Sequence, residues 1–408
     1  MGHDERQARF RGQTMIKIRV VLALALAVPL LLEGCGDAAR KPPAAAPSGG
    51  ASASPSASPS PSPVPLTLAI TPAPGAANQP VTTEVGTTVT GGKVSEVTLV
   101  DGSGKRVGGE LRADGSSWVP AAPLAFGASY TATVTATGDD GKTVSQTTKF
   151  ATMGRPGGSR VGSGLYMFNG QTYGVAMPVA VEFESDIPVE ARAAVQRRLF
   201  VKSDPPQTGA WHWFGARQVL YRPQVYWQPG TKLTVRSALA GLPIGKRYGD
   251  TDRSATVTIG RKLVIEVDNA TKIMNVYQDD ALLRTMPVSL GKPSTPSSSG
   301  TMVIMSKEES TIFDTTATDG ARGYRITIAY AQRLTWKGQY IHAAPWSVKD
   351  QGVRNVSHGC VNVSDSNAQW LFGLTLVGDP VTVRGTERGL DPGDGWTAWN
   401  LPWSEYVS

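Results

Sequence analysis

The sequence predicts a mainly β protein built from several domains. Its 408 residues are too many for one ordinary domain and suit two or three. Its 45 glycines and 29 prolines, with recurring runs of threonine and valine, favour strands and turns over helical bundles. We therefore expect two β-sandwiches in tandem, followed by a mixed, mostly β domain that carries a helix.

The first 35 residues have the pattern of a bacterial export signal. Several basic residues precede an apolar run from Val20 to Leu32, which is too short to span a bilayer comfortably and is typical of a signal peptide. The run ends in Leu32-Glu33-Gly34-Cys35, which resembles a lipobox, so we expect Cys35 to be lipidated. Glu33 is atypical there, and a plain secreted protein or an uncleaved anchor is the alternative. The basic residues are Arg9, Arg11, Lys17 and Arg19.

Residues 36–65 are rich in proline, serine and alanine and have almost nothing apolar to bury. This composition predicts a disordered tether that holds folded domains away from a membrane. We expect a lipid-anchored protein on the outer face of the cytoplasmic membrane, within the cell envelope. Once Cys35 is lipidated, Cys360 has no partner, and an unpaired cysteine in an exported protein is a candidate reactive thiol.

The formal net charge of the chain is +7, which has two possible meanings. We favour ordinary solubility as its meaning, with attraction to an anionic envelope polymer or membrane surface as the alternative. Basic residues do not cluster with interleaved aromatic residues, which argues against nucleic acid as a partner.

Residues 66–153 form short runs of alternating apolar and polar side chains, as half-buried strands do. Leu66–Ile70 and Tyr130–Thr135 alternate, and Asp101-Gly102 and Asp140-Gly141 are turn signals between such runs. Strands at this spacing indicate a β-sandwich of immunoglobulin type. Its core has no disulfide to support it and must depend on large side chains such as Trp118, Phe126 and Tyr130.

Residues 154–260 predict a second immunoglobulin-like module. Strands are expected at Val179–Phe183, Val219–Tyr221 and Lys232–Ser237, and a short helix at Val189–Leu199. On that helix, one face should hold Val189 or Ala193 together with Val195 and Leu199. We interpret the module's aromatic side chains as core and edge packing, with a carbohydrate platform as the alternative. These are Trp211, Trp213, Phe214, Tyr221, Tyr226 and Trp227.

Residues 261–384 predict the mixed, mostly β domain. Leu263–Val267 and Ile273–Tyr277 flank a turn and should form a hairpin. Ser364 is a plausible N-cap of a helix that reaches Phe372, with Ala368, Leu371 and Phe372 on one face. The other expected strands are Thr301–Ser306, Tyr324–Ala329, Gly338–Ile341 and Val381–Val383, and a Pro/Ser-rich loop spans Lys292–Gly300.

Cys360 is the only cysteine outside the leader, and His342 and His358 lie within twenty residues of it. An imidazole can take the thiol proton, and the thiolate can then attack an acyl carbon. A neighbouring imidazolium is expected to lower the thiol pKa from its usual value of about 8.5. A zinc site made of the same three residues is the alternative. It is disfavoured because the spacing does not match the usual Cys/His pairs and no fourth ligand is obvious nearby.

The run Ser357-His358-Gly359-Cys360-Val361-Asn362-Val363, with His342 upstream, resembles the active-site signature of L,D-transpeptidases, whose catalytic domain is of the YkuD type. The similarity extends upstream to Val288–Gly291 and Gly300-Thr301 and downstream to Asn367–Trp370. The tail Trp399–Trp403 resembles that of the actinobacterial branch, which also has a lipoprotein leader and two immunoglobulin-like modules. The resemblance therefore covers the whole mature chain.

The resemblance implies a role for each matching residue. Cys360 would be the nucleophile, and His342 its base and later its acid. The backbone N–H groups of Gly359 and Cys360, with the Tyr324 hydroxyl, would form the oxyanion site. A serine usually follows the base histidine, whereas this chain has Ala343, so a backbone carbonyl would have to orient the imidazole. The other implied residues are Tyr324, Lys337, Gly338 and Asn362 for substrate contact, His358 for shaping the loop, and Trp346 and Phe313 for the pocket wall and lid.

The implied reaction is acyl transfer between peptidoglycan stem peptides. Cys360 would attack the carbonyl of the third residue of a tetrapeptide stem, release D-alanine and hold the rest as a thioester. The side-chain amine of a second stem would then take the acyl group and form a 3-3 cross-link. No metal or organic cofactor is required, and carbapenem-type β-lactams are expected to acylate the same cysteine. Two alternatives are an L,D-carboxypeptidase, in which water is the acceptor, and a non-catalytic lipoprotein whose sandwiches grip the cell wall.

Residues 385–408 contain Trp396, Trp399 and Trp403. We interpret this segment as an aromatic strap that returns across the catalytic domain or onto the preceding β module, with sugar binding as the alternative. The run Asp391–Gly395 is too short for an EF-hand loop and is interpreted as a turn.

Overall fold

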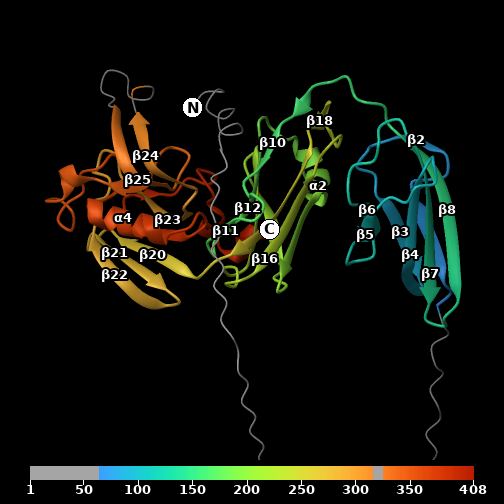
Figure 1. The fold of residues 1–408 in the computed structure, drawn as a ribbon, viewed down its shortest axis with the longest axis horizontal. Helices are drawn as coiled ribbons and strands as arrows, with labels where there is room; N and C mark the ends of the chain where they lie inside the picture. The colour runs from blue at the N-terminus through green and yellow to red at the C-terminus, as the bar shows by residue number, and fades with distance from the viewer. Residues whose placement is uncertain (1–63, 315, 317–324) are drawn as a thin grey trace, which may run out of the picture. The chain divides into compact units, whose positions relative to one another are not determined.

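The computed structural model describes residues 64–314, 316 and 325–408 (Figure 1). Strands dominate these residues, so the prediction of a mainly β protein is confirmed. Cys35 with the whole leader, and Tyr324, lie outside the described residues. In the described part of the chain, no helix has the length and apolar character needed to cross a bilayer.

Two four-stranded sheets form the first sandwich. Their strand orders are β1-β3-β6-β5 and β2-β8-β7-β4. Along β7, Tyr130, Ala132, Val134 and Ala136 are buried while the residues between them are more exposed, which confirms the predicted alternation. The strands are β1 (Thr67–Thr71), β2 (Ala76–Gln79), β3 (Val85–Thr90), β4 (Gly92–Asp101), β5 (Gly109–Leu111), β6 (Ser117–Pro120), β7 (Ser129–Gly138) and β8 (Thr143–Thr152).

The second module contains two four-stranded sheets and one small sheet, in the orders β10-β12-β15-β14, β11-β19-β16-β13 and β17-β18-β9. Helix α2 (Val189–Arg197) forms where expected, and Val195 is buried as predicted. Leu199 is also buried, although it lies beyond the end of the helix. The first turn was predicted wrongly, because the helix buries Ala191 there while Val189 is 74% exposed. The strands are β9 (Arg160–Val161), β10 (Ser163–Leu165), β11 (Thr172–Tyr173), β12 (Val179–Phe183), β13 (Leu199–Asp204), β14 (Gly209–Phe214), β15 (Gln218–Pro223), β16 (Lys232–Ala238), β17 (Pro243–Ile244), β18 (Arg247–Gly249) and β19 (Asp252–Ile259).

The third region has a six-stranded sheet, β22-β21-β20-β28-β23-β29, and a four-stranded sheet, β24-β25-β26-β27. Helix α4 (Asp365–Leu374) begins after Ser364, whose side chain accepts the Asn367 N–H, so the predicted N-cap is confirmed. The strands are β20 (Leu263–Asp268), β21 (Ile273–Gln278), β22 (Ala281–Pro287), β23 (Ser298–Val303), β24 (Ser306–Asp314), β25 (Arg325–Arg333), β26 (Tyr340–Ala343), β27 (Val361–Val363), β28 (Pro380–Arg384) and β29 (Arg388–Gly389). The short helices are η2 (Pro345–Ser347), η3 (Ala398–Asn400) and α5 (Trp403–Tyr406).

Two predicted strands are displaced in the structure. β26 begins at Tyr340 rather than Gly338, because Gly338 has φ +96° and belongs to the preceding turn. β23 covers Ser298–Val303 and ends three residues before the predicted Ser306, which instead begins β24.

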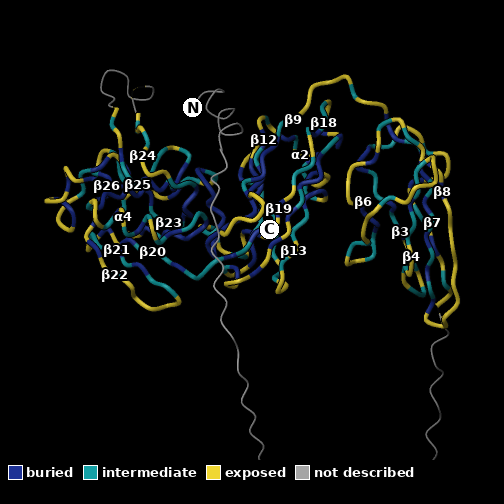
Figure 2. Tube along the Cα trace, viewed as in Figure 1, coloured by how far each residue is buried: buried dark blue, intermediate teal, exposed yellow. Residues whose placement is uncertain are grey.

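The buried residues, dark blue in Figure 2, form the apolar cores of the three regions. Trp118 and Tyr130 are buried in the first core, and Phe126 packs against it, as predicted. In the second module, Phe214 and Trp227 are buried and the other four aromatic side chains of the set pack against the same core. This supports the packing interpretation over a carbohydrate platform.

The C-terminal segment packs on the second module. Arg222 donates to the carbonyl oxygens of Ala398 and Leu401, at 3.0 and 2.7 Å, and the Trp399 indole donates to Ala176 O at 2.7 Å. The Arg222 guanidinium also lies 4.6 Å from the centroid of the Trp399 ring. The predicted aromatic strap is therefore confirmed as a packing element.

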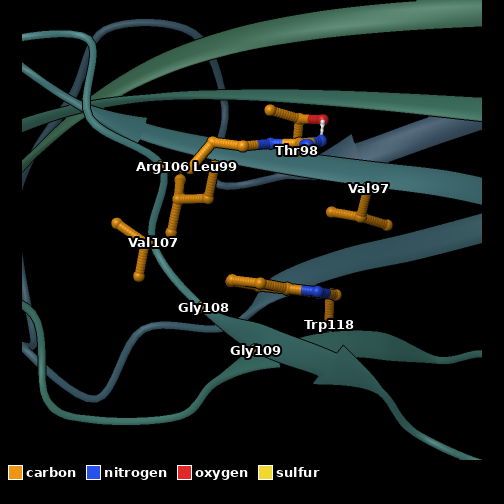
Figure 3. A pocket seen from close by; sticks show the side chains of 8 residues that line it. All are labelled: Val97, Thr98, Leu99, Arg106, Val107, Gly108, Gly109 and Trp118. Carbon is orange, nitrogen blue, oxygen red and sulfur yellow. Dashed lines mark hydrogen bonds between the residues drawn. The ribbon is translucent and has the colours of Figure 1, made fainter.

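A cavity of about 390 Å³ opens in the first sandwich, beside strand β4 and the loop before β5 (Figure 3). Its lining contains none of the residues predicted to carry chemistry. The lining residues are Val97, Thr98, Leu99, Arg106, Val107, Gly108, Gly109 and Trp118.

Candidate active site

The pairing of two parallel strands sets the relation between Cys360 and His342. Cys360 directly precedes β27, and β26 pairs with β27 so that His342 lies opposite Asn362. Their neighbours Ile341 and Val361 point into the core beneath the sheet. Because side chains alternate along a strand, the imidazole, the thiol and the Asn362 amide share the opposite face. The sheet thus gathers on one face the three polar groups that the sequence singled out.

The main chain orients the imidazole of His342. Its Nδ1 atom lies 2.8 Å from the carbonyl oxygen of Ala343. A carbonyl oxygen only accepts, so Nδ1 carries the proton and the lone pair of the neutral ring is on Nε2. Burial lowers the pKa of His342, and the Ala343 carbonyl offsets part of that effect. The neutral form, which can act as a base, is therefore the favoured one.

The thiol of Cys360 is covered in this structure. Cys360 is 5% exposed and lies in a small apolar cluster with Ile328, Ala331 and Tyr340, against which Phe313 packs. Burial raises the pKa of the thiol to about 12, although the Tyr340 N–H partly opposes this. The expectation of a lowered pKa is wrong for this conformation, because the loss of hydration outweighs every polar contact of the sulfur.

The turn before β26 contacts the sulfur directly. Cys360 Sγ lies 3.8 Å from the carbonyl oxygen of Gly338. Gly338 has φ +96°, and an added Cβ would lie 3.3 Å from the Phe313 ring, so glycine suits this position. Lys337, its neighbour, is held by the C-terminal segment: its N–H donates to Asp394 at 2.8 Å and its ammonium to Asp391 at 2.5 Å.

Asn362 presents an unsatisfied acceptor at the site. Its side chain is 3% exposed, and its Nδ2 donates to the Ser347 hydroxyl at 3.2 Å. Its Oδ1 is buried and has no hydrogen-bond partner among the residues described. A buried acceptor without a partner is costly, so an incoming amide N–H would bind there favourably.

One of the two predicted oxyanion donors, the Gly359 N–H, is already hydrogen-bonded within the loop before Cys360. The Gly359 N–H donates to the Ser357 hydroxyl at 3.1 Å, and that hydroxyl donates to Cys360 O at 2.7 Å. The expectation that Gly359 supplies a free donor is therefore wrong in this conformation. The Cys360 N–H has no acceptor within the described part of the chain, so it remains the available backbone donor.

His358 points to a different partner from His342. Its Nε2 lies 3.0 Å from the ammonium of Lys292. A cation in that position disfavours a metal ion on the same nitrogen. Within residues 64–314, 316 and 325–408, no group of three or more His, Cys, Asp or Glu residues is arranged to hold a metal ion. The zinc alternative for His342, His358 and Cys360 finds no support in this geometry.

The aromatic side chains predicted to line the pocket lie on both sides of the site. Trp346 is 52% exposed, and its ring centroid is 6.0 Å from that of His342. Phe313, on β24, meets Tyr340 edge to face at 5.9 Å. Trp346 therefore offers an open surface beside the base, whereas Phe313 belongs to the cover over the sulfur.

Sequence reasoning missed the serines and lysine that hold the loop. Ser297 donates to Gly359 O at 2.8 Å, and Ser347 contacts Asn362. Ser297 and Lys292 belong to the segment that was predicted only as a Pro/Ser-rich loop. Such a loop has no periodicity to indicate which hydroxyl points inward, and only the tertiary pairing of Gly291 with Ser357 shows it.

Family models match most of the described chain. The bacterial Ig domain matches residues 76–243, and the L,D-transpeptidase catalytic domain matches residues 262–383. The domain boundaries at 153/154 and 260/261 stay predictions, although β8 ends at Thr152 and β19 at Ile259.

Two curated relatives are similar over nearly the same length. L,D-transpeptidase 2 of Mycobacterium tuberculosis is 34% identical over 347 residues, covering 81% of this chain and 82% of the relative. L,D-transpeptidase 5 of the same species is 34% identical over 341 residues, covering 81% and 72%.

Solved structures are similar over about half of the chain. The LD transpeptidase LdtMt1 in complex with imipenem is 35% identical, with 54% of this chain and 97% of that chain covered and a TM-score of 0.46. L,D-transpeptidase 3 from Mycobacterium tuberculosis in complex with a faropenem-derived adduct is 30% identical, with the same coverage of both chains and a TM-score of 0.45.

Proposed function

The chain belongs to the L,D-transpeptidase family and acts on peptidoglycan, and from this premise we propose that Cys360 is its acyl-transfer nucleophile and His342 its base. The observation that carries the proposal is the shared sheet face of these two residues, with the His342 tautomer fixed by Ala343 O. A neutral imidazole with its lone pair on Nε2 is the form that a proton acceptor needs.

The first half-reaction breaks one amide bond. The thiol proton passes to Nε2 of His342, and the sulfur attacks the carbonyl carbon of the third residue of a tetrapeptide stem. The Cys360 N–H stabilises the oxyanion that forms. The intermediate then collapses: the C–N bond to D-alanine breaks, its nitrogen takes the proton from His342, and a thioester remains.

The second half-reaction restores the enzyme. The side-chain amine of a second stem attacks the thioester carbonyl and gives a proton to His342. The C–S bond breaks, and the sulfur recovers that proton. One amide has been exchanged for another, so the 3-3 cross-link forms without an oxidant, a reductant or an external energy source.

The raised pKa of Cys360 sets a condition on the first step. Its cause is burial beneath the apolar cluster that includes Phe313 and Tyr340. Displacing this cover hydrates the sulfur and returns the pKa toward its ordinary value. We therefore expect attack to follow movement of strands β24 and β25 away from the thiol.

The same chemistry extends to β-lactams. Two relatives have solved structures in complex with imipenem and with a faropenem-derived adduct. In this chain, opening of the lactam ring by Cys360 would leave a covalent thioester, because the leaving nitrogen stays attached to the acyl group.

We propose a location outside the cytoplasmic membrane on the basis of residues 1–65 of the sequence. A signal peptide, Cys35 as a lipidation site and a polar tether would place the domains outside the cytoplasmic membrane, where the stem peptides are.

Mass spectrometry of products from a purified disaccharide-tetrapeptide tests the function. The wild type is expected to release D-alanine and form a cross-linked dimer, whereas Cys360→Ala should leave the substrate unchanged. A tripeptide monomer as the sole product would identify a carboxypeptidase. Binding to purified sacculi without any product would indicate a wall-binding protein, and dimer formation by Cys360→Ala would overturn the proposal.

A further inference from the structure

One buried hydroxyl holds the peptide bond that joins Gly359 to Cys360. Ser297 is 1% exposed, and its Oγ lies 2.8 Å from Gly359 O and 2.9 Å from the N–H of Gly291. The Gly291 amide can only donate, and a serine hydroxyl has one proton, so that proton goes to the Gly359 carbonyl. The direction of both bonds is thereby fixed.

Because the peptide unit is planar, the hydrogen bond to Gly359 O also fixes the direction of the Cys360 N–H. A trans peptide places its N–H and its C=O on opposite sides of one rigid plane. The hydroxyl that fixes Gly359 O therefore also fixes where the Cys360 N–H points. Gly359 has φ +124°, a conformation in which only glycine moves easily, so this plane would otherwise be unusually free to rotate.

The loop that carries Ser297 is itself anchored to the nucleophile segment. The N–H of Lys292 donates to Ser357 O, and the N–H of Ser357 donates to Leu290 O, both at 3.0 Å. Thr295 Oγ1 also contacts Ser357 O at 3.3 Å. Ser297 is thus a fixed support rather than a mobile side chain that happens to lie close.

We propose that Ser297 is a positioning residue, which aims the Cys360 N–H at the oxyanion of the tetrahedral intermediate by holding the Gly359 carbonyl. The inference rests on the proposed function, because it assumes acyl transfer at Cys360. It assigns no contact between Ser297 and the substrate. Its role is to keep the remaining backbone donor in place, since the Gly359 N–H is already bonded to Ser357.

Acylation and alkylation of the Cys360 sulfur distinguish a positioning role of Ser297 from a general structural one. Acylation by a carbapenem forms a tetrahedral oxyanion, whereas alkylation by iodoacetamide displaces iodide at a saturated carbon and forms none. Ser297→Ala is expected to slow acylation by about 10- to 100-fold, because a misdirected oxyanion donor loses much of its effect. The alkylation rate should stay within about two-fold, since thiol access and ionisation are unchanged.

Matched variants control for packing. Threonine and valine have nearly the same shape, so Ser297→Thr should retain acylation while Ser297→Val loses it, which keeps the test valid if Ser297→Ala fails to fold. Ser299→Ala removes a nearby hydroxyl that bonds to Thr386 instead, and it should acylate as the wild type does. Thermal unfolding confirms that each variant is folded.

The possible results distinguish a failure of the Ser297 role from a failure of acyl transfer at Cys360. Slow acylation with normal alkylation in Ser297→Ala, restored in Ser297→Thr, supports the inference. Equal acylation in wild type and Ser297→Ala, or an equal loss of both reactions, overturns it and leaves the function standing. A wild type that forms no adduct on Cys360 overturns both.

Discussion

The Nδ1 atom of His342 lies 2.8 Å from the carbonyl oxygen of Ala343, the next residue along the chain. The bond belongs to strand β26, whose pairing with β27 holds Ala343 opposite Val363. The sheet therefore selects the imidazole tautomer, and the side chain that follows the histidine need not supply a hydroxyl. Ala343, where the sequence resemblance led us to expect serine, therefore leaves the orienting contact intact.

Ala343→Ser is expected to change the rate of carbapenem acylation by no more than about three-fold, because the orienting oxygen belongs to the backbone. Ala343 is 2% exposed, so the added hydroxyl should cost about 1–3 kcal/mol of stability unless it finds a partner. Acylation kinetics and thermal unfolding measure the two effects, with His342→Ala as the inactive reference. A rise in rate above about ten-fold would show that a side-chain hydroxyl is the better orienting group.

The pH dependence of acylation should report the buried imidazole. Burial lowers the pKa of His342 from its usual 6.5, so the ring stays neutral and basic at pH values where an exposed histidine is already protonated. The second-order rate constant for acylation should therefore be level near neutrality and fall to half only below pH 6.5. It reports the free enzyme when measured at low carbapenem concentration.

A half-point above pH 6.5 would contradict this expectation. It would mean that the folded protein stabilises the imidazolium, as a thiolate–imidazolium pair does. Repeating the titration with iodoacetamide gives an independent reading, because that reaction follows the ionisation of the same sulfur without a leaving group that needs a proton.

Local patterns in the sequence were sufficient for much of the fold. The alternation along Tyr130–Thr135 predicted a strand whose inward face is buried, and Ser364 predicted the start of α4. Helix α2 was located correctly, and Val195 is buried as predicted, but Ala191 takes the buried position expected of Val189, because nine residues with few large apolar side chains define a face poorly. Only tertiary contacts decide between these two residues.

At the candidate site too, local sequence patterns predicted some features, whereas others depend on tertiary contacts. The sequence pattern around Cys360 predicted the two residues that we propose as nucleophile and base, since both lie in short, distinctive segments. The cover over the sulfur and the support from Ser297 could not be predicted, because each depends on residues that meet only after folding. Ser297 and Gly359 are 62 positions apart, and nothing in the Pro/Ser-rich loop distinguishes one serine from the next.

Removing the cover should make the thiol more reactive. Phe313 packs against the cluster that buries Cys360, and its ring meets Tyr340 edge to face. Phe313→Ala admits water, so the pKa of the thiol should fall from about 12 and iodoacetamide should alkylate it about 3- to 10-fold faster near neutral pH. Ile312→Ala is the matched control, because that neighbour on β24 is 54% exposed. Equal alkylation of all three proteins would show that Phe313 does not limit access to the sulfur.

Glu84 should make the stability of the two sandwiches depend on pH. Its carboxylate accepts from Arg112 of the first module and Arg198 of the second, both at 2.7 Å, and from the Ser117 hydroxyl. Burial raises its pKa, but these donors more than offset that effect and lower it from 4.5 to about 2. The folded state therefore binds this proton less readily than the unfolded chain does.

The sign of the effect follows from that difference. The stabilisation is fully present above pH 4.5 and is lost as the pH falls toward 2, with an upper limit of about 3 kcal/mol. Burial also lowers the pKa of Arg198, so the desolvation of that cation offsets part of the stabilisation.

Glu84→Gln should lower the melting temperature near pH 7 and have a smaller effect near pH 3, as calorimetry at the two pH values can measure. Glu96→Gln disrupts an ion pair with Arg106 in which both side chains are about two-thirds exposed, and it should change little at either pH. A Glu84→Gln variant that loses as much stability on acidification as the wild type would show that another carboxylate governs the acid limb.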